Sequence, residues 1–185
     1  MSSLLIVPIS PYDKDGVEGL VAPLQTIFRL PVSVDPRNSL DPSFAFDTFR
    51  NQYNSTSIIS ELDERFAESD KKILGVSSLD FFVPVLTYVF GEAQLDGRIA
   101  VVSSHRLDEA LYGLPANPEL LRDRLVKEAV HELGHVFGLI HCHDYMCVMH
   151  ASTVVEDIDV KSERFCAHCD AMLKSKVNGS LSAFY

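Results

Sequence analysis

The sequence lacks several features, and each absence narrows the range of functions. No apolar run is long enough to cross a bilayer, which argues against an integral membrane protein. Internal repeats and low-complexity linkers are also missing, so we expect the 185 residues to form one domain with a proper core. Basic residues are few: 16 lysines and arginines stand against 26 aspartates and glutamates, for a net charge of -10. Such an acidic surface repels phosphate groups, which argues against nucleic acids and anionic membranes as partners.

Cysteine is scarce as well, with four residues that fall into two pairs. Cys142 and Cys147 are separated by four residues, and Cys166 and Cys169 by two. Both spacings are typical of a structural zinc site, and disulfide bonds are the competing interpretation. Disulfides need an oxidising compartment, but no secretory leader is visible, because the short apolar run 4–9 contains a proline and follows no basic residue. We therefore favour a zinc ion held by four thiolates in a cytoplasmic protein.

The strongest positive signal is the segment HELGHVFGLIH, which begins at His131. His131 and His135 are four residues apart, so a helix would place both imidazoles on one face, where they can share a metal ion. Gly138 can leave the helix with positive φ and turn the chain so that His141 returns as a third ligand. Three protein ligands leave a fourth position for water, which is the arrangement of a catalytic zinc. Glu132 lies beside that face, where it could take a proton from the metal-bound water.

Together these motifs resemble the archaemetzincin (archaelysin) family of zinc metallopeptidases, in the metzincin clan. The shared features are the extended histidine motif, a cysteine directly after the third histidine, another cysteine shortly before Met149, and a final Cys-x-x-Cys pair. The similarity covers about residues 128–169, and residues 88–93 also look family-like. The gap between Met149 and Cys166 is about one residue shorter than the family pattern, a difference that a loop tolerates.

The resemblance implies hydrolysis of peptide bonds in a peptide or protein substrate, with two zinc ions per chain. A catalytic zinc would be bound by His131, His135 and His141, and Glu132 would pass a proton from its water to the leaving amine. A structural zinc would be bound by the four cysteines. Met149 would be the Met-turn residue, an apolar floor beneath the catalytic metal.

Apolar periodicity predicts an α/β fold. Strands are expected near residues 4–9, 31–35, 73–76, 86–93 and 99–103, and helices near 17–28, 55–66, 118–138 and 166–177. This order predicts a twisted, mixed but mostly parallel sheet packed on helices, with the histidine helix beneath it. The resemblance implies one metzincin-like domain over residues 1–185. Its N-terminal subdomain would be residues 1–138, and a C-terminal subdomain, residues 139–185, would hold the Met-turn and the cysteine zinc.

Two further expectations concern how the site is organised. Metzincins bind peptides extended along an edge strand above the zinc, so residues 90–93 are expected to pair with the substrate main chain; an inert edge with a glycine bulge is the alternative. Cys142 directly follows His141, so ligands of two different metals are neighbours, about 3.8 Å apart at Cα. We hypothesise that the cysteine zinc holds His141 and the Met-turn in place.

Two other functions stay open. A zinc-binding regulatory or interaction protein could keep the fold and hydrolyse little, although an intact Glu132 argues against it. A zinc-ribbon-like module would make the histidines incidental and would bind one zinc rather than two. The sequence does not distinguish an aminopeptidase-like from an endopeptidase action, and it does not choose between Tyr112 and Tyr145 as an oxyanion donor.

Overall fold

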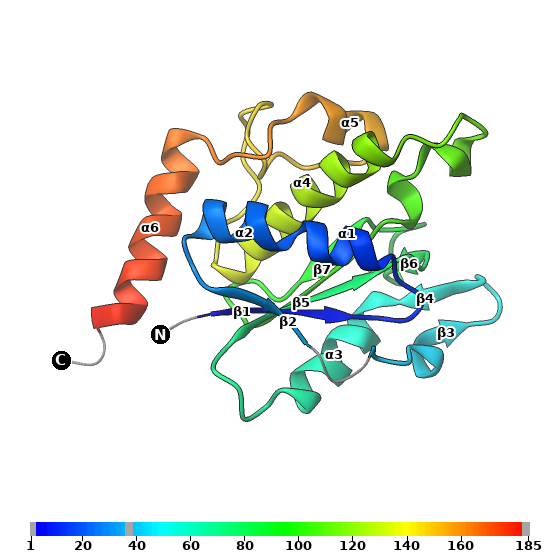
Figure 1. The fold of residues 1–185 in the computed structure, drawn as a ribbon, viewed down its shortest axis with the longest axis horizontal. Helices are drawn as coiled ribbons and strands as arrows, with labels where there is room; N and C mark the ends of the chain where they lie inside the picture. The colour runs from blue at the N-terminus through cyan, green and yellow to red at the C-terminus, as the bar shows by residue number, and fades with distance from the viewer. Residues whose placement is uncertain (1–2, 36–38, 183–185) are drawn as a thin grey trace.

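A five-stranded sheet, in the order β2-β1-β5-β8-β7, forms the centre of the molecule (Figure 1). The computed structural model describes residues 3–35 and 39–182. The strands are β1 (Leu4–Pro8), β2 (Val32–Val34), β5 (Lys72–Ser77), β7 (Gly91–Ala93) and β8 (Ile99–Ser103). The first four in the order run parallel, whereas β7 pairs antiparallel with β8 at the edge. The predicted α/β fold with a mixed, mostly parallel sheet is therefore confirmed.

Helices cover both faces of this sheet (Figure 1). On one side lie α1 (Lys14–Gly19), α2 (Val21–Phe28) and α4 (Pro118–Val136), and on the other lies α3 (Ser55–Arg65). Alternate side chains of β1 divide between the two cores: Leu4 and Ile6 pack with α1, α2 and α4, while Leu5 and Val7 pack with α3. The central strands are buried on both faces, which explains their near-continuous apolar runs.

Two elements differ from the sequence-based expectation. The helix expected at 17–28 is two helices that meet at Leu20, because Pro23 lacks an amide proton and is tolerated only in a first turn. The strand expected at 86–93 is regular only from Gly91 to Ala93, and residues 86–90 form a loop. Residues 88–90 of this loop contact the hydrophobic core without forming a strand, and Phe90 among them is buried there.

A second, three-stranded sheet was not predicted. It contains β3 (Phe46–Asp47), β4 (Gln52–Asn54) and β6 (Phe81–Phe82), in the order β3-β4-β6. Strands of two or three residues are too short to show a period of two, so periodicity has no signal there. Short 3-10 helices complete this half of the chain at Ser43–Ala45, His105–Leu107 and Glu109–Tyr112.

Helix α4 packs on the same face of the sheet as α1 and α2, and it carries the first two histidines. The Asn117 side chain accepts a hydrogen bond from the Leu120 amide (3.1 Å) and Pro118 occupies the first turn, as expected for this helix start. From Arg124 onward nearly every residue of α4 is buried, because sheet, loop and C-terminal helices surround it. The predicted helix at about 118–138 is therefore present, ending at Val136.

The chain beyond α4 forms a long loop followed by α5 (Val155–Val160) and α6 (Ala167–Ser182). Helix α6 stands at one side of the molecule, next to the end of α2 (Figure 1). The division into two subdomains at residue 138 stays a prediction. Within the described ranges, no helix has both the length and the apolar character needed to cross a bilayer.

Candidate metal centre

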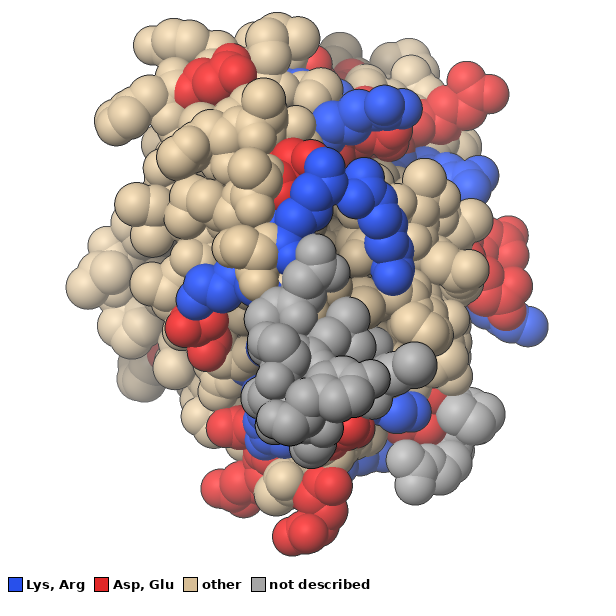
Figure 2. Space-filling model, turned by 90° about the vertical axis from the view of Figure 1, so that its left-hand side faces the viewer, with Lys and Arg blue, Asp and Glu red and all other residues tan. Residues whose placement is uncertain are grey.

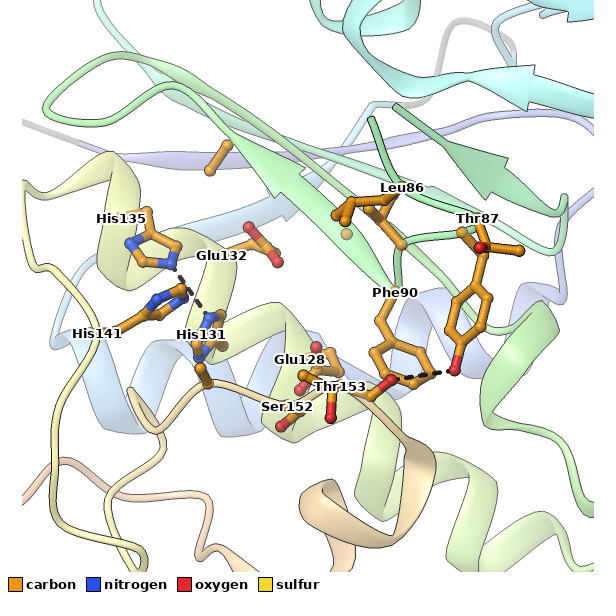
Figure 3. A pocket seen from close by; sticks show the side chains of 15 residues that line it. Leu86, Thr87, Phe90, Glu128, His131, Glu132, His135, His141, Ser152 and Thr153 are labelled. Carbon is orange, nitrogen blue, oxygen red and sulfur yellow. Dashed lines mark hydrogen bonds between the residues drawn. The ribbon is translucent and has the colours of Figure 1, made fainter. Parts of the chain in front are cut away.

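Three histidine side chains converge at the C-terminal end of α4. His131 and His135 come from consecutive turns of the helix, and His141 comes from the loop that follows it (Figure 3). One ring nitrogen from each lies within 4.8 Å of those of the other two. The Nε2 atoms of His131 and His135 are 3.1 Å apart. The structure thus brings together the three residues that the sequence motif singled out.

The turn that returns His141 depends on Gly138, which has a φ of 83°. The Gly138 amide donates to the His135 carbonyl (2.8 Å), and the Leu139 amide donates to the Gly134 carbonyl (3.0 Å), a helix ending that favours glycine. A Cβ atom at Gly138 would also lie 3.0 Å from Asp96 Oδ1. Both backbone conformation and space therefore favour glycine at this position.

Backbone carbonyls orient two of the rings. Nδ1 of His131 lies 2.8 Å from the Val148 carbonyl oxygen, and Nδ1 of His135 lies 2.8 Å from that of Leu139. Because a carbonyl only accepts, each Nδ1 must carry the proton and donate it. Each Nε2 then carries a lone pair that points at the other ring. The carbonyl oxygens thus fix the tautomer and the orientation of both rings, which prepares the two histidines for metal binding.

The donor set fits a zinc ion. Two lone pairs 3.1 Å apart repel one another unless a cation lies between them, so the paired Nε2 atoms are themselves evidence for a cation site. Burial, aided by the positive charge of Lys161, lowers the pKa of His131, His135 and His141, which keeps the rings neutral at physiological pH. Three neutral imidazoles suit zinc better than calcium or magnesium, which prefer oxygen ligands.

Glu132 is buried against the edge strand. Figure 3 shows its carboxylate turned into the cavity that the histidines line. Burial raises the pKa of Glu132 well above its ordinary value, and the negative charge of Glu128 raises it further. A Cβ atom at Gly91 of β7 would lie 2.6 Å from Glu132 Cγ. Gly91 therefore allows β7 to approach the carboxylate side chain closely, a reason for this glycine that the sequence did not reveal.

Met149, the expected Met-turn residue, is fully buried and packs against α4. A Cβ atom at Gly134 of α4 would collide with Met149 Sδ, so this mid-helix glycine makes room for the sulfur. The Met149 carbonyl accepts a hydrogen bond from the Cys142 amide (2.9 Å). That Met149 forms an apolar floor beneath the catalytic metal stays a prediction.

The four cysteines form a second cluster. Cys142, Cys147, Cys166 and Cys169 are all free thiols, and their sulfur atoms lie within 4.8 Å of one another. The Cys142 and Cys166 sulfurs are 3.8 Å apart, far beyond the length of a disulfide bond, so the disulfide alternative is not supported. The structure groups these four residues without a histidine: His150 instead pairs with the Cys142 carbonyl through Nδ1 (2.9 Å).

Comparison with known proteins agrees with this geometry, since the chain matches Peptidase family M54 over residues 28–175. The chain belongs to this family, the archaemetzincins. An archaemetzincin from Thermococcus kodakarensis is 38% identical over 178 residues, which cover 94% of this chain and 96% of the relative. One from Methanocaldococcus jannaschii is 42% identical over 135 residues, 73% of each chain. The family resemblance predicted from the motifs is confirmed.

Solved structures of family members have the same fold. A zinc-dependent peptidase from Methanocorpusculum labreanum superposes with a TM-score of 0.84 at 30% identity, covering 92% of this chain and all of that one (100%). An archaemetzincin from Archaeoglobus fulgidus, crystallised with malonate, gives a TM-score of 0.78 at 40% identity, covering 93% and 99%. The single-domain archaemetzincin architecture is therefore shared along nearly the whole chain.

In this archaemetzincin fold, the histidines open into a cavity of about 460 Å³. The cavity lies between the edge strand β7 above, α4 below, and a wall formed by residues 151–153 (Figure 3). At one side of the cavity the Tyr88 hydroxyl donates to the Thr153 carbonyl (3.1 Å), which links the loop before β7 to this wall.

Sequence reasoning missed several residues of this cavity, among them Tyr88, Glu128 and Ser152. Glu128 precedes His131 by three residues and shares its helix face, a signal that helical spacing offers. The two tyrosines considered as oxyanion donors do not line the cavity: Tyr112 donates to the Arg106 carbonyl (2.9 Å), and the Tyr145 ring packs on His150.

Proposed function

We propose that this archaemetzincin hydrolyses peptide bonds at the three-histidine site, with His131, His135 and His141 as the ligands of a catalytic zinc ion. The observation that carries the proposal is the pair of Nε2 lone pairs held 3.1 Å apart beside a buried carboxyl group. When bound, zinc supplies Lewis acidity, which acidifies water and polarises a carbonyl group. Membership of a zinc-dependent peptidase family supports this activity over a silent regulatory role.

Glu132 is the proton carrier in this proposal. Burial raises the pKa of its carboxyl group above the ordinary value, which makes the carboxylate a stronger base toward water. It would remove the proton of the attacking water and deliver that proton to the amine that leaves. Packing of Glu132 against Gly91 limits the positions that its side chain can adopt, which keeps the carboxylate in the cavity.

The edge strand β7 would bind the main chain of the substrate. It pairs with β8 on one side, and no described strand pairs with its other side. Gly91 and Ala93 of this strand line the cavity above the histidines. An extended peptide that adds to this edge would lay its scissile bond over the site.

A structural zinc at the four cysteines gives two zinc ions per chain. The support is the tetrad of free thiols, a ligand set that closed structural sites use. Free thiols also accord with the reducing cytoplasm, which stays the expected compartment. A zinc-ribbon-like module with one zinc is disfavoured, because it gives no reason for three histidines to converge.

A peptide-library screen with three proteins tests the proposal: wild type, Glu132→Gln, and Glu119→Gln as a matched control on the exposed first turn of the same helix. We expect cleavage by wild type and by Glu119→Gln, and a loss of roughly 100-fold or more in kcat for Glu132→Gln. Metal analysis should find two zinc ions in all three. Equal cleavage by wild type and Glu132→Gln would refute the assignment.

A further inference from the structure

We propose, on the basis of the peptidase function above, that the cavity beside the histidines selects a substrate side chain that ends in a cation, lysine or arginine, and that Glu128 is the residue that selects it. Glu128 is buried, lies on α4 one turn before Glu132, and lines the same cavity. Figure 3 shows Glu128 next to Ser152, on the other side of His131 from His135 and His141. A side chain next to the scissile bond would reach it.

The lining of the cavity suits a long side chain with a polar end. Leu86, Val89 and Phe90 contribute apolar surface along it, which would pack against a methylene chain. At one end the Tyr88 hydroxyl already donates to the Thr153 carbonyl, and the Thr153 hydroxyl donates to Asp157. Glu128 and Ser152 are further polar side chains of the lining, together with Thr87.

Glu128 presents negative charge to this space. Its partner is Lys161, whose Nζ lies 2.8 Å from Glu128 Oε1, and both side chains are buried, at 4% and 0% exposed. Lys161 does not line the cavity, and it also donates to the His150 carbonyl (3.3 Å). Of the two members of this ion pair, the carboxylate is therefore the one that borders the cavity.

Two polar atoms at this place lack hydrogen bonds within the described part of the chain. Oε1 of Glu128 touches Lys161 without the alignment that a hydrogen bond needs, and the buried Ser152 Oγ has no hydrogen-bond partner. Buried polar atoms without partners are costly, so they point to a missing ligand group. A cationic donor that enters the cavity would bind the carboxylate and the hydroxyl together.

This arrangement predicts a rank order of substrates. An ammonium or guanidinium end gains a charge-assisted hydrogen bond to Glu128. An apolar end of the same length leaves the Ser152 hydroxyl without a partner and gains nothing from Glu128, and a carboxylate end is repelled. A site whose polar groups require a hydrogen-bond donor rejects side chains that lack one. The preference for a cationic side chain should therefore exceed what the shape of the cavity alone would give.

The first experiment uses zinc-loaded protein and three peptides that differ at one residue, lysine, norleucine or glutamate, placed in turn on either side of the scissile bond. At one of the two positions we expect kcat/KM to be roughly 10- to 100-fold higher for lysine than for norleucine, and lowest for glutamate. Glu128→Gln should bring the lysine to norleucine ratio close to one, whereas the exposed control Glu119→Gln should keep it. A merely structural Glu128 would instead lower all three values together.

Because Glu128→Gln leaves the Lys161 charge unpaired, a second variant guards against misfolding. Glu128→Gln combined with Lys161→Met removes both charges, and it should fold, bind zinc and also lose the lysine preference. If wild type prefers norleucine or glutamate at both positions, or if the double variant keeps the lysine preference, the role of Glu128 is wrong.

A binding experiment separates this inference from the proposed function. In the Glu132→Gln background, calorimetry should give a Kd roughly 10-fold lower for the lysine peptide than for the norleucine peptide, and adding Glu128→Gln should abolish the difference. Selective binding by a wild-type protein that cleaves no peptide would overturn the peptidase function and leave the Glu128 assignment standing. Cleavage by wild type with equal rates for the lysine and norleucine peptides would overturn the Glu128 assignment and leave the peptidase function standing.

Discussion

At the scale of single residues, two glycines shape the site by leaving space. Gly91 lets the edge strand approach Glu132, and Gly134 lets α4 approach Met149. Glycine inside a helix costs about 1 kcal/mol relative to alanine, so its place in α4 needs a compensating contact. The buried Met149 sulfur is that contact.

Gly91→Ala should lower activity by displacing Glu132. The added Cβ would lie 2.6 Å from Glu132 Cγ and 2.7 Å from the Val101 carbonyl oxygen, so side chain or strand must shift. We expect a loss of about 1–3 kcal/mol in the free energy of unfolding and a fall in kcat, with normal zinc content. Metal analysis, urea unfolding and peptide cleavage check this. An unchanged kcat would show that the close packing does not position the carboxylate.

Gly134→Ala should destabilise the protein in spite of the better helix propensity of alanine, by about 1–3 kcal/mol, because its Cβ would collide with Met149 Sδ. In a Met149→Ala background the space is free, so the same change should cost less or should stabilise. Urea unfolding of the four proteins in this double-mutant cycle gives the interaction energy. Additive effects of the two substitutions would contradict the contact.

At the scale of elements, a buried arginine joins α4 to its surroundings. Arg124 binds Asp159 of α5 in bidentate fashion, with two contacts of 2.7 Å, and forms a 2.7 Å ion pair with Glu109. It also donates to the Leu107 carbonyl (2.8 Å). One side chain thus ties the histidine helix to α5 and to two 3-10 helices.

Arg124→Met should cost about 3 kcal/mol in the free energy of unfolding, because it strips the charge partner from Asp159 and Glu109. The estimate sits at the low end for a buried pair, since Asp159 is 35% exposed and water can compensate part of the loss. Arg122→Met is the matched control: its side chain is exposed two residues earlier on the same helix, and its effect should stay within about 0.5 kcal/mol. Similar losses for both variants would argue against the network.

At the scale of the whole molecule, the two clusters of metal ligands are mechanically joined. His141 and Cys142 are adjacent in the chain, the Cys142 amide binds the Met149 carbonyl, and the Cys142 carbonyl accepts from His150. The charged side chains, in contrast, form no separate acidic and basic regions on the face that Figure 2 shows. On the face in Figure 2, basic and acidic side chains are interspersed, and most of that surface carries no charge.

Cys166→Ser should therefore weaken zinc binding at the histidines as well as at the cysteines, because loss of the thiolate site frees the loop that carries His141 and Met149. We expect the Kd for zinc at the histidine site to rise roughly 10-fold or more, as when a group that holds a metal ligand in place is removed. His168→Ala, an exposed neighbour outside the cysteine cluster, is the control. Unchanged affinity at the histidine site in Cys166→Ser would remove the coupling.

The two sites should differ in the protons they release on binding zinc. Burial raises the pKa of Cys147 and Cys169, so these thiols hold protons at about pH 7.5 that zinc must displace. The lowered pKa values of the three histidines leave their rings neutral at that pH. Cysteine-site affinity should therefore fall as the pH drops through the neutral range, while histidine-site affinity should fall only below about pH 6.5. Zinc calorimetry at several pH values measures both affinities, and a histidine-site affinity that falls in parallel with the cysteine-site affinity above about pH 6.5 would contradict this.

The parts of the molecule whose geometry is local could be predicted from the sequence. Two histidines four apart on a helix, a glycine turn and two cysteine pairs impose their arrangement within a few residues, so the ligand sets and α4 could be predicted. The short strands β3, β4 and β6 could not, because they exist only through pairing with distant segments. Two further contacts likewise join segments that are tens of residues apart in the chain. They are the close approach of Gly91 to Glu132 and the ion pair of Glu128 with Lys161. Only packing of the sheet and loops on α4 decides them, because side-chain proximity across a fold depends on tertiary structure rather than on spacing.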